Sequence, residues 1–139
     1  MAGVMLEDLK VGQSSSVTKK VTERDIELFG EVSGDRNPVH FDEAYAKTTM
    51  FKTRIAHGML SASFFSTILG TQLPGPGTIY MSQTLRFKAP VKIGETVTAT
   101  CTVKDIAKEK KRVTLDCVAK VGETVVVEGE ALVMAPSKA

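Results

Sequence analysis

The residues best suited to acid–base chemistry in this sequence are Asp35 and His40, five positions apart in the stretch Ser33–His40 (SGDRNPVH). Gly34 and Pro38 bracket the acid. Glycine adopts torsion angles that other residues avoid, and proline restricts both itself and the residue before it, so a shaped loop is predicted. A carboxylate and an imidazole on such a loop can take a proton from water and return one. Alone, the acid would be explained as a loop cap and the imidazole as a buried structural histidine.

Composition indicates an ordinary globular protein and excludes several function classes. With 139 residues, 42% apolar and 24% charged, the chain is expected to form one domain. A net charge of +2 with mixed signs does not favour nucleic acid as a partner. The N-terminal residues include Glu7 and Asp8 and lack the apolar core of a signal peptide, so we expect a cytoplasmic protein. Cys101 and Cys117 have no metal-site spacing, but they would face each other if Lys108–Arg112 formed a hairpin turn.

Two helices are expected to position the loop. Thr22 is a predicted N-cap for a helix that ends where the loop begins. Asn37 followed by proline can start a second, short helix, with the amide as its cap. This places His40 in the first turn of a rigid element, and Tyr45 and Ala46 are expected to face inward.

The segment Ile55–Leu85 contains no Asp, Glu, Lys or Arg. Pro74 and Pro76 interrupt it, and its longest helical part, Met59 to about Thr71, is shorter than the roughly 20 residues needed to cross a bilayer. A helix that is apolar on nearly all sides is expected to be buried in protein. We therefore predict a central helix and no membrane association.

The second half of the chain changes to a period of two, which is typical of strands with one buried face. Thr96–Val103 and Val113–Val121 alternate in this way. Further strands are predicted for Thr78–Lys88 and Thr124–Met134, and an edge strand for Gln13–Val21. The fold class is therefore α+β, with an antiparallel sheet of about five strands curved around the central apolar helix.

The stretch Phe29–His40 resembles the signature of the MaoC-like, (R)-specific enoyl-CoA hydratases, in which an aromatic residue precedes Ser/Thr-Gly-Asp-x-Asn-Pro-aliphatic-His. Ala56–Leu60, Leu73–Gly77 and Leu85–Pro90 extend the resemblance over nearly the whole chain. It implies a single hotdog domain over residues 1–139, in which a sheet wraps a long central helix, and a homodimer.

The resemblance also implies the roles of three residues. Asp35 and His40 would be the catalytic dyad that holds water against C3 of a trans-2-enoyl thioester, with no cofactor and no metal. The product would be the (R)-3-hydroxyacyl thioester. The reaction places negative charge on the thioester oxygen, and the family uses for it the backbone N–H that corresponds here to Gly58, at the start of the central helix.

Six further residues are candidates for substrate binding: Asn37, His57, Ser66, Leu69, Arg86 and Lys88. The asparagine is better explained as a structural cap that shapes the loop, and the histidine as an orienting or structural residue rather than a proton carrier. Ser66 and Leu69 match positions that line the acyl pocket in some family members, although packing in the core explains them equally well. The two basic residues would meet the phosphates of coenzyme A or simply carry surface charge.

Three alternatives to a hydratase acting on enoyl-CoA stay open. The same dyad would serve a 3-hydroxyacyl-acyl-carrier-protein dehydratase of fatty-acid synthesis. The sequence does not distinguish coenzyme A from acyl carrier protein as the carrier, nor does it indicate the acyl chain length. A hotdog thioesterase generally places an acid on or near the central helix, and Met59–Thr71 has none. A non-enzymatic acyl-CoA sensor would be expected to carry a DNA-binding extension, for which 139 residues leave no room.

Overall fold

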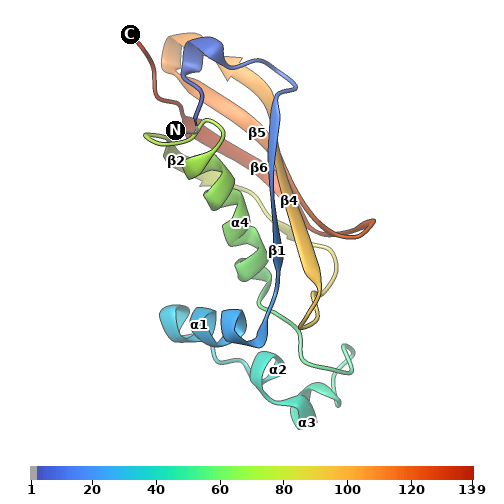
Figure 1. Ribbon diagram of the computed structural model, residues 1–139. Helices are drawn as coiled ribbons and strands as arrows, with labels where there is room; N and C mark the ends of the chain where they lie inside the picture. Colours follow the sequence, from blue (N-terminus) through green and yellow to red (C-terminus); the bar gives the residue numbers. More distant parts are fainter. Residues whose placement is uncertain (1–2) are drawn as a thin grey trace.

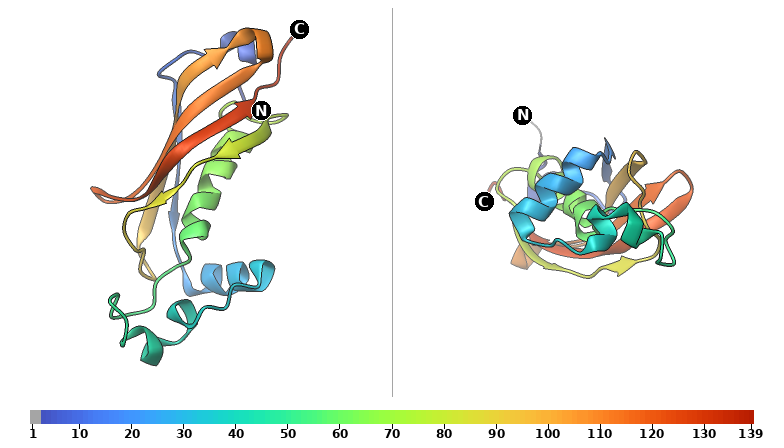
Figure 2. Two further views of the ribbon diagram at one scale, coloured as in Figure 1. Left: turned by 180° about the vertical axis from the view of Figure 1, so that it is seen from behind. Right: turned by 90° about the horizontal axis from the view of Figure 1, so that it is seen from below.

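The computed structural model describes residues 3–139, so Met1 and Ala2, which belong to the N-terminal segment considered above, lie outside it. A six-stranded antiparallel sheet curves around one side of a long helix (Figures 1 and 2). The strands are β1 Ser14–Lys20, β2 Ile79–Gln83, β3 Arg86–Phe87, β4 Thr96–Ala107, β5 Arg112–Val121 and β6 Thr124–Met134. Their order is β1-β4-β5-β6-β2, and β3 also pairs with β6. The α+β class and the predicted edge strand are confirmed.

The helices are α1 Glu23–Ser33, α2 Pro38–Phe41, α3 Glu43–Ala46 and α4 Gly58–Thr71, with short 3₁₀ turns at Leu6–Asp8 and Lys108–Lys110. The first three gather at the N-terminal end of α4 (Figure 1). The predicted second helix is in fact two, because the Asp42 side chain caps a new helix by accepting from the Tyr45 N–H. Ala46 is buried as expected, but Tyr45 is 46% exposed, so its inward orientation was predicted wrongly.

The long strands bury the apolar face that their alternation predicts. Val97, Ala99 and Cys101 of β4 are fully buried, as are the alternating residues of β5. Cys101 lies directly opposite Cys117, with 3.6 Å between the sulfur atoms, and both are free thiols. The chain turns at Lys108–Lys111 between the antiparallel strands β4 and β5, which is the hairpin that this pairing of the cysteines requires.

Helix α4 lies against this face of the sheet, but only part of its own surface is covered. Phe65 and Ile68 are fully buried in the core. On the other side Met59 is 53% exposed, and Ser63, Ser66, Thr67 and Gly70 are exposed as well. The expectation that the uncharged helix is buried all round is therefore wrong for the single chain. Within residues 3–139, no helix combines the length and the apolar character that crossing a membrane requires.

The predicted strand Thr78–Lys88 is not one strand. A register irregularity falls between Tyr80 and Ser82, and the chain leaves the sheet before β3 begins. Both pieces pair with β6, the last strand of the chain, and not with β4, the next strand after them. A Cβ atom on Gly129 of β6 would lie 1.8 Å from the Thr84 carbonyl oxygen. Glycine is therefore required where the backbone between β2 and β3 lies closest to β6.

Candidate active site

The loop between α1 and α2 has the shape that its glycine and proline predict. Thr22 and Asp25 form a capping box at the start of α1, and Gly34, at φ 79°, ends the helix. Asn37 caps α2 by accepting from the Val39 N–H at 3.2 Å, and Pro38 is its first residue. These local bonds fix the backbone on both sides of the acid.

The Asp35 carboxylate is exposed, and one of its oxygens accepts a bond from the Asn37 N–H at 3.2 Å. The second oxygen is available to another donor. Asn37 itself is exposed and acts as the cap of α2, which supports its structural interpretation. It is not among the residues that line the cavity described below.

His40 is 8% exposed, and its Nδ1 lies 2.8 Å from the Ile55 carbonyl oxygen. Because a carbonyl only accepts, Nδ1 carries the hydrogen, and Nε2 of the neutral ring keeps its lone pair. Arg54 holds the same turn by donating from Nε to the His40 carbonyl oxygen at 2.8 Å, while its guanidinium pairs with Glu23 at 2.6 Å. Burial lowers the pKa of His40, and the nearby His57 lowers this pKa further; the Ile55 carbonyl and the Asp35 carboxylate oppose both.

His57 is the N-terminal cap residue of α4 and is 2% exposed. Its ring stacks on that of His40, with 3.9 Å between the centroids and 28° between the planes. Its Nε2 lies 2.9 Å from the backbone carbonyl oxygen of Asp35, so it donates there. His57 therefore ties the Asp35 loop to the start of the central helix.

The side chains of Asp35, His40 and His57 offer ligand atoms within 4.8 Å of one another, a donor set that zinc can use. Nδ1 of His40 donates to the Ile55 carbonyl, and Nε2 of His57 donates to the Asp35 carbonyl. The two rings are stacked, with 3.9 Å between their centroids and 28° between their planes, so the two remaining in-plane lone pairs do not converge on one point. Zn–N bonds are about 2.0–2.1 Å long, so these lone pairs are poorly placed to share one ion. The arrangement suits proton transfer better than metal binding.

A cavity of about 470 Å³ opens beside these groups. Asp35, His40 and Gly58 line it, and its other walls come from the loop before α4, from β3 and the segment after it, and from β6. The first N–H groups of a helix have no partner inside the helix and favour negative charge, and Gly58 is the first residue of α4. A Cβ atom on Gly58 would lie 2.6 Å from Cδ1 of Phe87, so the absence of a side chain lets the Phe87 ring pack against the first residue of α4.

The structure brings together the three residues predicted to be catalytic, and it separates part of the predicted substrate-binding set. Ser66 is exposed and Leu69 is 1% exposed in the core, and neither lines the cavity. Lys88 lines the cavity with a side chain that is 49% exposed, and its Nζ lies 3.9 Å from Glu128. Arg86 is exposed on β3 and does not line the cavity.

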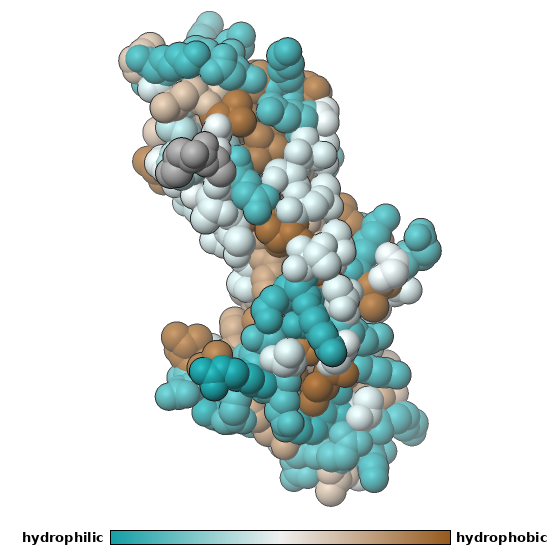
Figure 3. Space-filling view, in the orientation of Figure 1, coloured by the Kyte–Doolittle hydropathy of each residue, from teal (hydrophilic) through white to brown (hydrophobic). Residues whose placement is uncertain are grey.

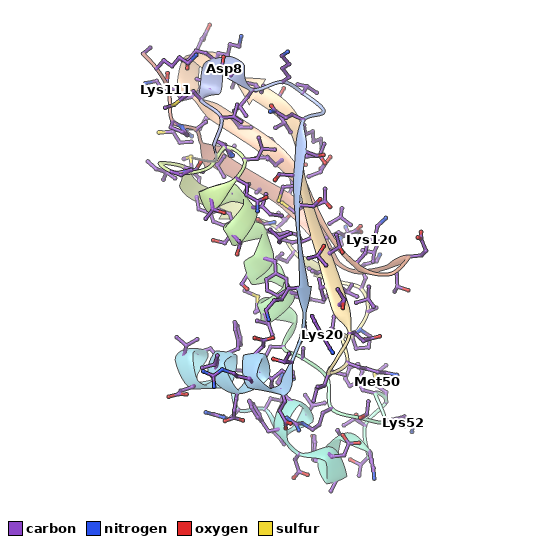
Figure 4. All side chains as sticks on the ribbon, viewed as in Figure 1. Asp8, Lys20, Met50, Lys52, Lys111 and Lys120 are labelled. Atoms are coloured by element: carbon purple, nitrogen blue, oxygen red, sulfur yellow. The ribbon has the colours of Figure 1, made fainter. Side chains whose placement is uncertain are left out.

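Sequence reasoning missed several cavity residues. Met50 and Phe51 lie on the loop after α3, and Figure 4 shows Met50 beside Lys52 at the same end of the molecule as α1 to α3. No motif marks this loop. Ser61 and Phe87 also line the cavity. Both had a signal in the sequence, because Ser61 is one of the small residues of α4 that leave room for an acyl chain and Phe87 lies in the segment Leu85–Pro90 that carries the family resemblance.

A curved antiparallel sheet around one helix, with an acid and an imidazole at the start of that helix, defines a hotdog-fold protein of the MaoC-like class. The MaoC like domain matches residues 8–127, so the chain belongs to this family. It is 59% identical, over 132 residues, to the (R)-specific enoyl-CoA hydratase of Rhodospirillum rubrum, covering 95% of this chain and 92% of that protein. It is 48% identical, over 132 residues, to the 3-hydroxybutyryl-CoA dehydratase of Methylorubrum extorquens, covering 95% and 84%.

Solved structures agree with these relatives. The R-hydratase PhaJ1 of Pseudomonas aeruginosa superposes with a TM-score of 0.92 at 48% identity, over 98% of this chain and 88% of that one. The (R)-hydratase of Aeromonas caviae, described as involved in PHA biosynthesis, gives 0.91 at 43% identity, over 94% and 99%. The predicted family and fold are confirmed.

Proposed function

We propose that this protein is a hydro-lyase that reversibly hydrates trans-2-enoyl-CoA to (R)-3-hydroxyacyl-CoA. The observation that carries the proposal is the unprotonated Nε2 of His40 beside the Asp35 carboxylate, in a cavity that Gly58 also lines. The names of the similar proteins support it, because they include an (R)-specific enoyl-CoA hydratase at 59% identity. A thioesterase is disfavoured, since α4 contains no acid.

In the proposed mechanism one water molecule lies between the dyad and C3 of the substrate. Nε2 of His40 takes one proton of this water, while Asp35 accepts the other hydrogen and orients the oxygen. The water oxygen bonds to C3, and the π electrons of the double bond move onto the thioester oxygen. The Gly58 N–H stabilises that charge. Protonated His40 then delivers its proton to C2, the thioester carbonyl re-forms, and addition to one face gives the (R) product.

The dyad is tested by Asp35→Asn and His40→Gln, which keep the size and much of the hydrogen bonding of each side chain. Each variant is expected to lose at least about a hundredfold in kcat for crotonyl-CoA, because general acid–base catalysis is worth roughly that much or more. The measurement is the loss of the enoyl thioester absorbance. Glu31→Gln, on the exposed surface of α1, is the matched control. Wild-type rates in either dyad variant would refute the assignment.

The carrier of the acyl chain is part of the same proposal. Lys88 lines the cavity and its side chain is half exposed, so its ammonium group would meet a phosphate of coenzyme A there. Arg86 is a weaker candidate because it lies outside the cavity lining. Rates across chain lengths on coenzyme A and on acyl carrier protein would separate a hydratase of free acyl-CoA from a dehydratase of fatty-acid synthesis.

A homodimer is the proposed assembly. Edge strand β2 exposes Ile79, Tyr80 and Met81, and the uncovered face of α4 is close to it in the fold. Pale and brown residues, neither charged nor strongly hydrophilic, cover much of the middle of the molecule over α4 (Figure 3). A second copy on this side would bury both surfaces. We also propose a cytoplasmic location.

A further inference from the structure

Two buried polar atoms near the start of α4 lack hydrogen-bond partners among residues 3–139: Nδ1 of His57 and Oγ of Ser61. Both residues are 2% exposed, and both line the cavity. A buried polar group without a partner costs about 1–3 kcal/mol. Two such groups in one small region therefore call for an explanation.

The tautomer of His57 makes the two atoms complementary. Its Nε2–H donates to the Asp35 carbonyl, so Nδ1 of the neutral ring is a bare acceptor. The Ser61 hydroxyl is a donor. The two residues are four positions apart, at the cap and in the first turns of one helix, and both face the same cavity. A rotation of the serine side chain, or one water from the adjoining cavity, would be needed to join the donor to the acceptor.

We propose that the Ser61 hydroxyl donates to His57 Nδ1, directly or through one water, and that this pair positions the Asp35 loop for catalysis. The bond keeps His57 as an Nε2–H donor to the Asp35 carbonyl. His57 precedes Gly58, so the pair also sets the distance between the carboxylate and the N–H that faces the thioester oxygen. Both are positioning residues and not catalytic ones. Only the kinetic consequence rests on the proposed hydratase function.

The bond is tested without substrate by long-range ¹H–¹⁵N NMR of the imidazole rings. The chain has two histidines, so the spectrum contains two rings, which His40→Gln and His57→Gln assign. We expect opposite tautomers, with Nδ1–H in His40 and Nε2–H in His57. Ser61→Ala should move the Nδ1 signal of His57 downfield, toward that of a free acceptor, and Ser61→Thr should leave it in place. An unmoved signal in Ser61→Ala, or an Nδ1–H tautomer of His57, overturns the proposal.

The kinetic consequence is tested with crotonyl-CoA. Ser61→Ala should lower kcat roughly three- to tenfold, the equivalent of one hydrogen bond, with little change in KM. Ser61→Thr should restore kcat. His57→Gln should keep more activity than His57→Ala, because the glutamine amide nitrogen reaches the position of Nε2 and still donates to Asp35.

Thermal unfolding of each variant separates misfolding from loss of positioning. A folded Ser61→Ala with wild-type kcat overturns the positioning role. A wild-type enzyme that does not hydrate crotonyl-CoA refutes the proposed function instead, and the NMR result then still decides whether the pair exists.

Discussion

At the scale of single residues, a backbone carbonyl decides which nitrogen of each histidine is free. The Ile55 carbonyl takes Nδ1–H of His40 and leaves Nε2 bare, whereas the Asp35 carbonyl takes Nε2–H of His57 and leaves Nδ1 bare. Two identical rings, stacked 3.9 Å apart, thus have different chemistry. The first can act as a base toward substrate, and the second holds a loop.

The pH dependence of the reaction follows from the environment of His40. Burial lowers the pKa of His40 below its ordinary value of 6.5. The base is therefore unprotonated, and active, at pH values where a free histidine would be charged. We expect the acid limb of kcat/KM for crotonyl-CoA to have its midpoint below pH 6.5. A midpoint above that value would contradict the assignment.

The same shift makes a stability prediction. Because the folded-state pKa of His40 is depressed, the unfolded chain binds more protons between that pKa and 6.5. The free energy of unfolding should therefore fall as the pH is lowered through this window. Urea unfolding at several pH values measures it, and His40→Gln should remove this part of the slope.

Gly58 offers a steric test of the N–H that faces the thioester oxygen. In Gly58→Ala the new Cβ would lie 2.6 Å from the ring of Phe87, which is 55% exposed and can turn away. The fold should survive, whereas kcat/KM should fall at least about tenfold because the methyl group crowds the oxyanion donor. The double variant with Phe87→Ala separates the causes. Recovery of kcat/KM in the double variant would show that the displaced Phe87 ring causes the loss. A wild-type kcat/KM in Gly58→Ala would refute the role of Gly58.

At the scale of elements, the sequence predicted the helix boundaries around the loop because their causes are local. Thr22, Gly34 and Asn37 act within three or four residues of themselves, and the structure places each cap as expected. The strand Thr78–Lys88 was predicted wrongly because its division depends on β6, far away in the sequence. No residue near Thr84 in the sequence indicates that its carbonyl oxygen must lie against Gly129.

The position of α2 against α1 depends on another glycine. A Cβ atom on Gly30 would lie 2.5 Å from Cζ of Phe41, whose ring lies 6.4 Å from that of His40. Gly30→Ala should displace α2 and lower both kcat and the thermal midpoint, at a cost of about 1–3 kcal/mol for overpacking. Glu31→Ala, exposed on the same helix, is the control and should change neither. A fully active Gly30→Ala would show that α2 is not held by this contact.

At the scale of the whole molecule, the sequence predicted a central helix but not which of its sides would be covered. The absence of charge in α4 is compatible with burial by one sheet or by a sheet and a second copy. The exposed positions, such as Ser63 and Thr67, are small and polar rather than charged. Small side chains let two helices or chains approach closely. Whether Ser66 and Leu69 line an acyl pocket depends on tertiary structure, and neither lines the cavity of the single chain.

The proposed dimer makes a prediction about edge strand β2. Ile79 is 56% exposed there, although an unprotected apolar edge invites pairing with another chain. Ile79→Lys should convert the dimer to a monomer in sedimentation velocity, because a charge inside an apolar interface is costly. Val11→Lys is the control, since Val11 is 66% exposed and precedes β1 at the opposite edge of the sheet. If activity falls with dissociation, the second copy contributes to the site. If Ile79→Lys remains dimeric, β2 is not the interface and another surface must be sought.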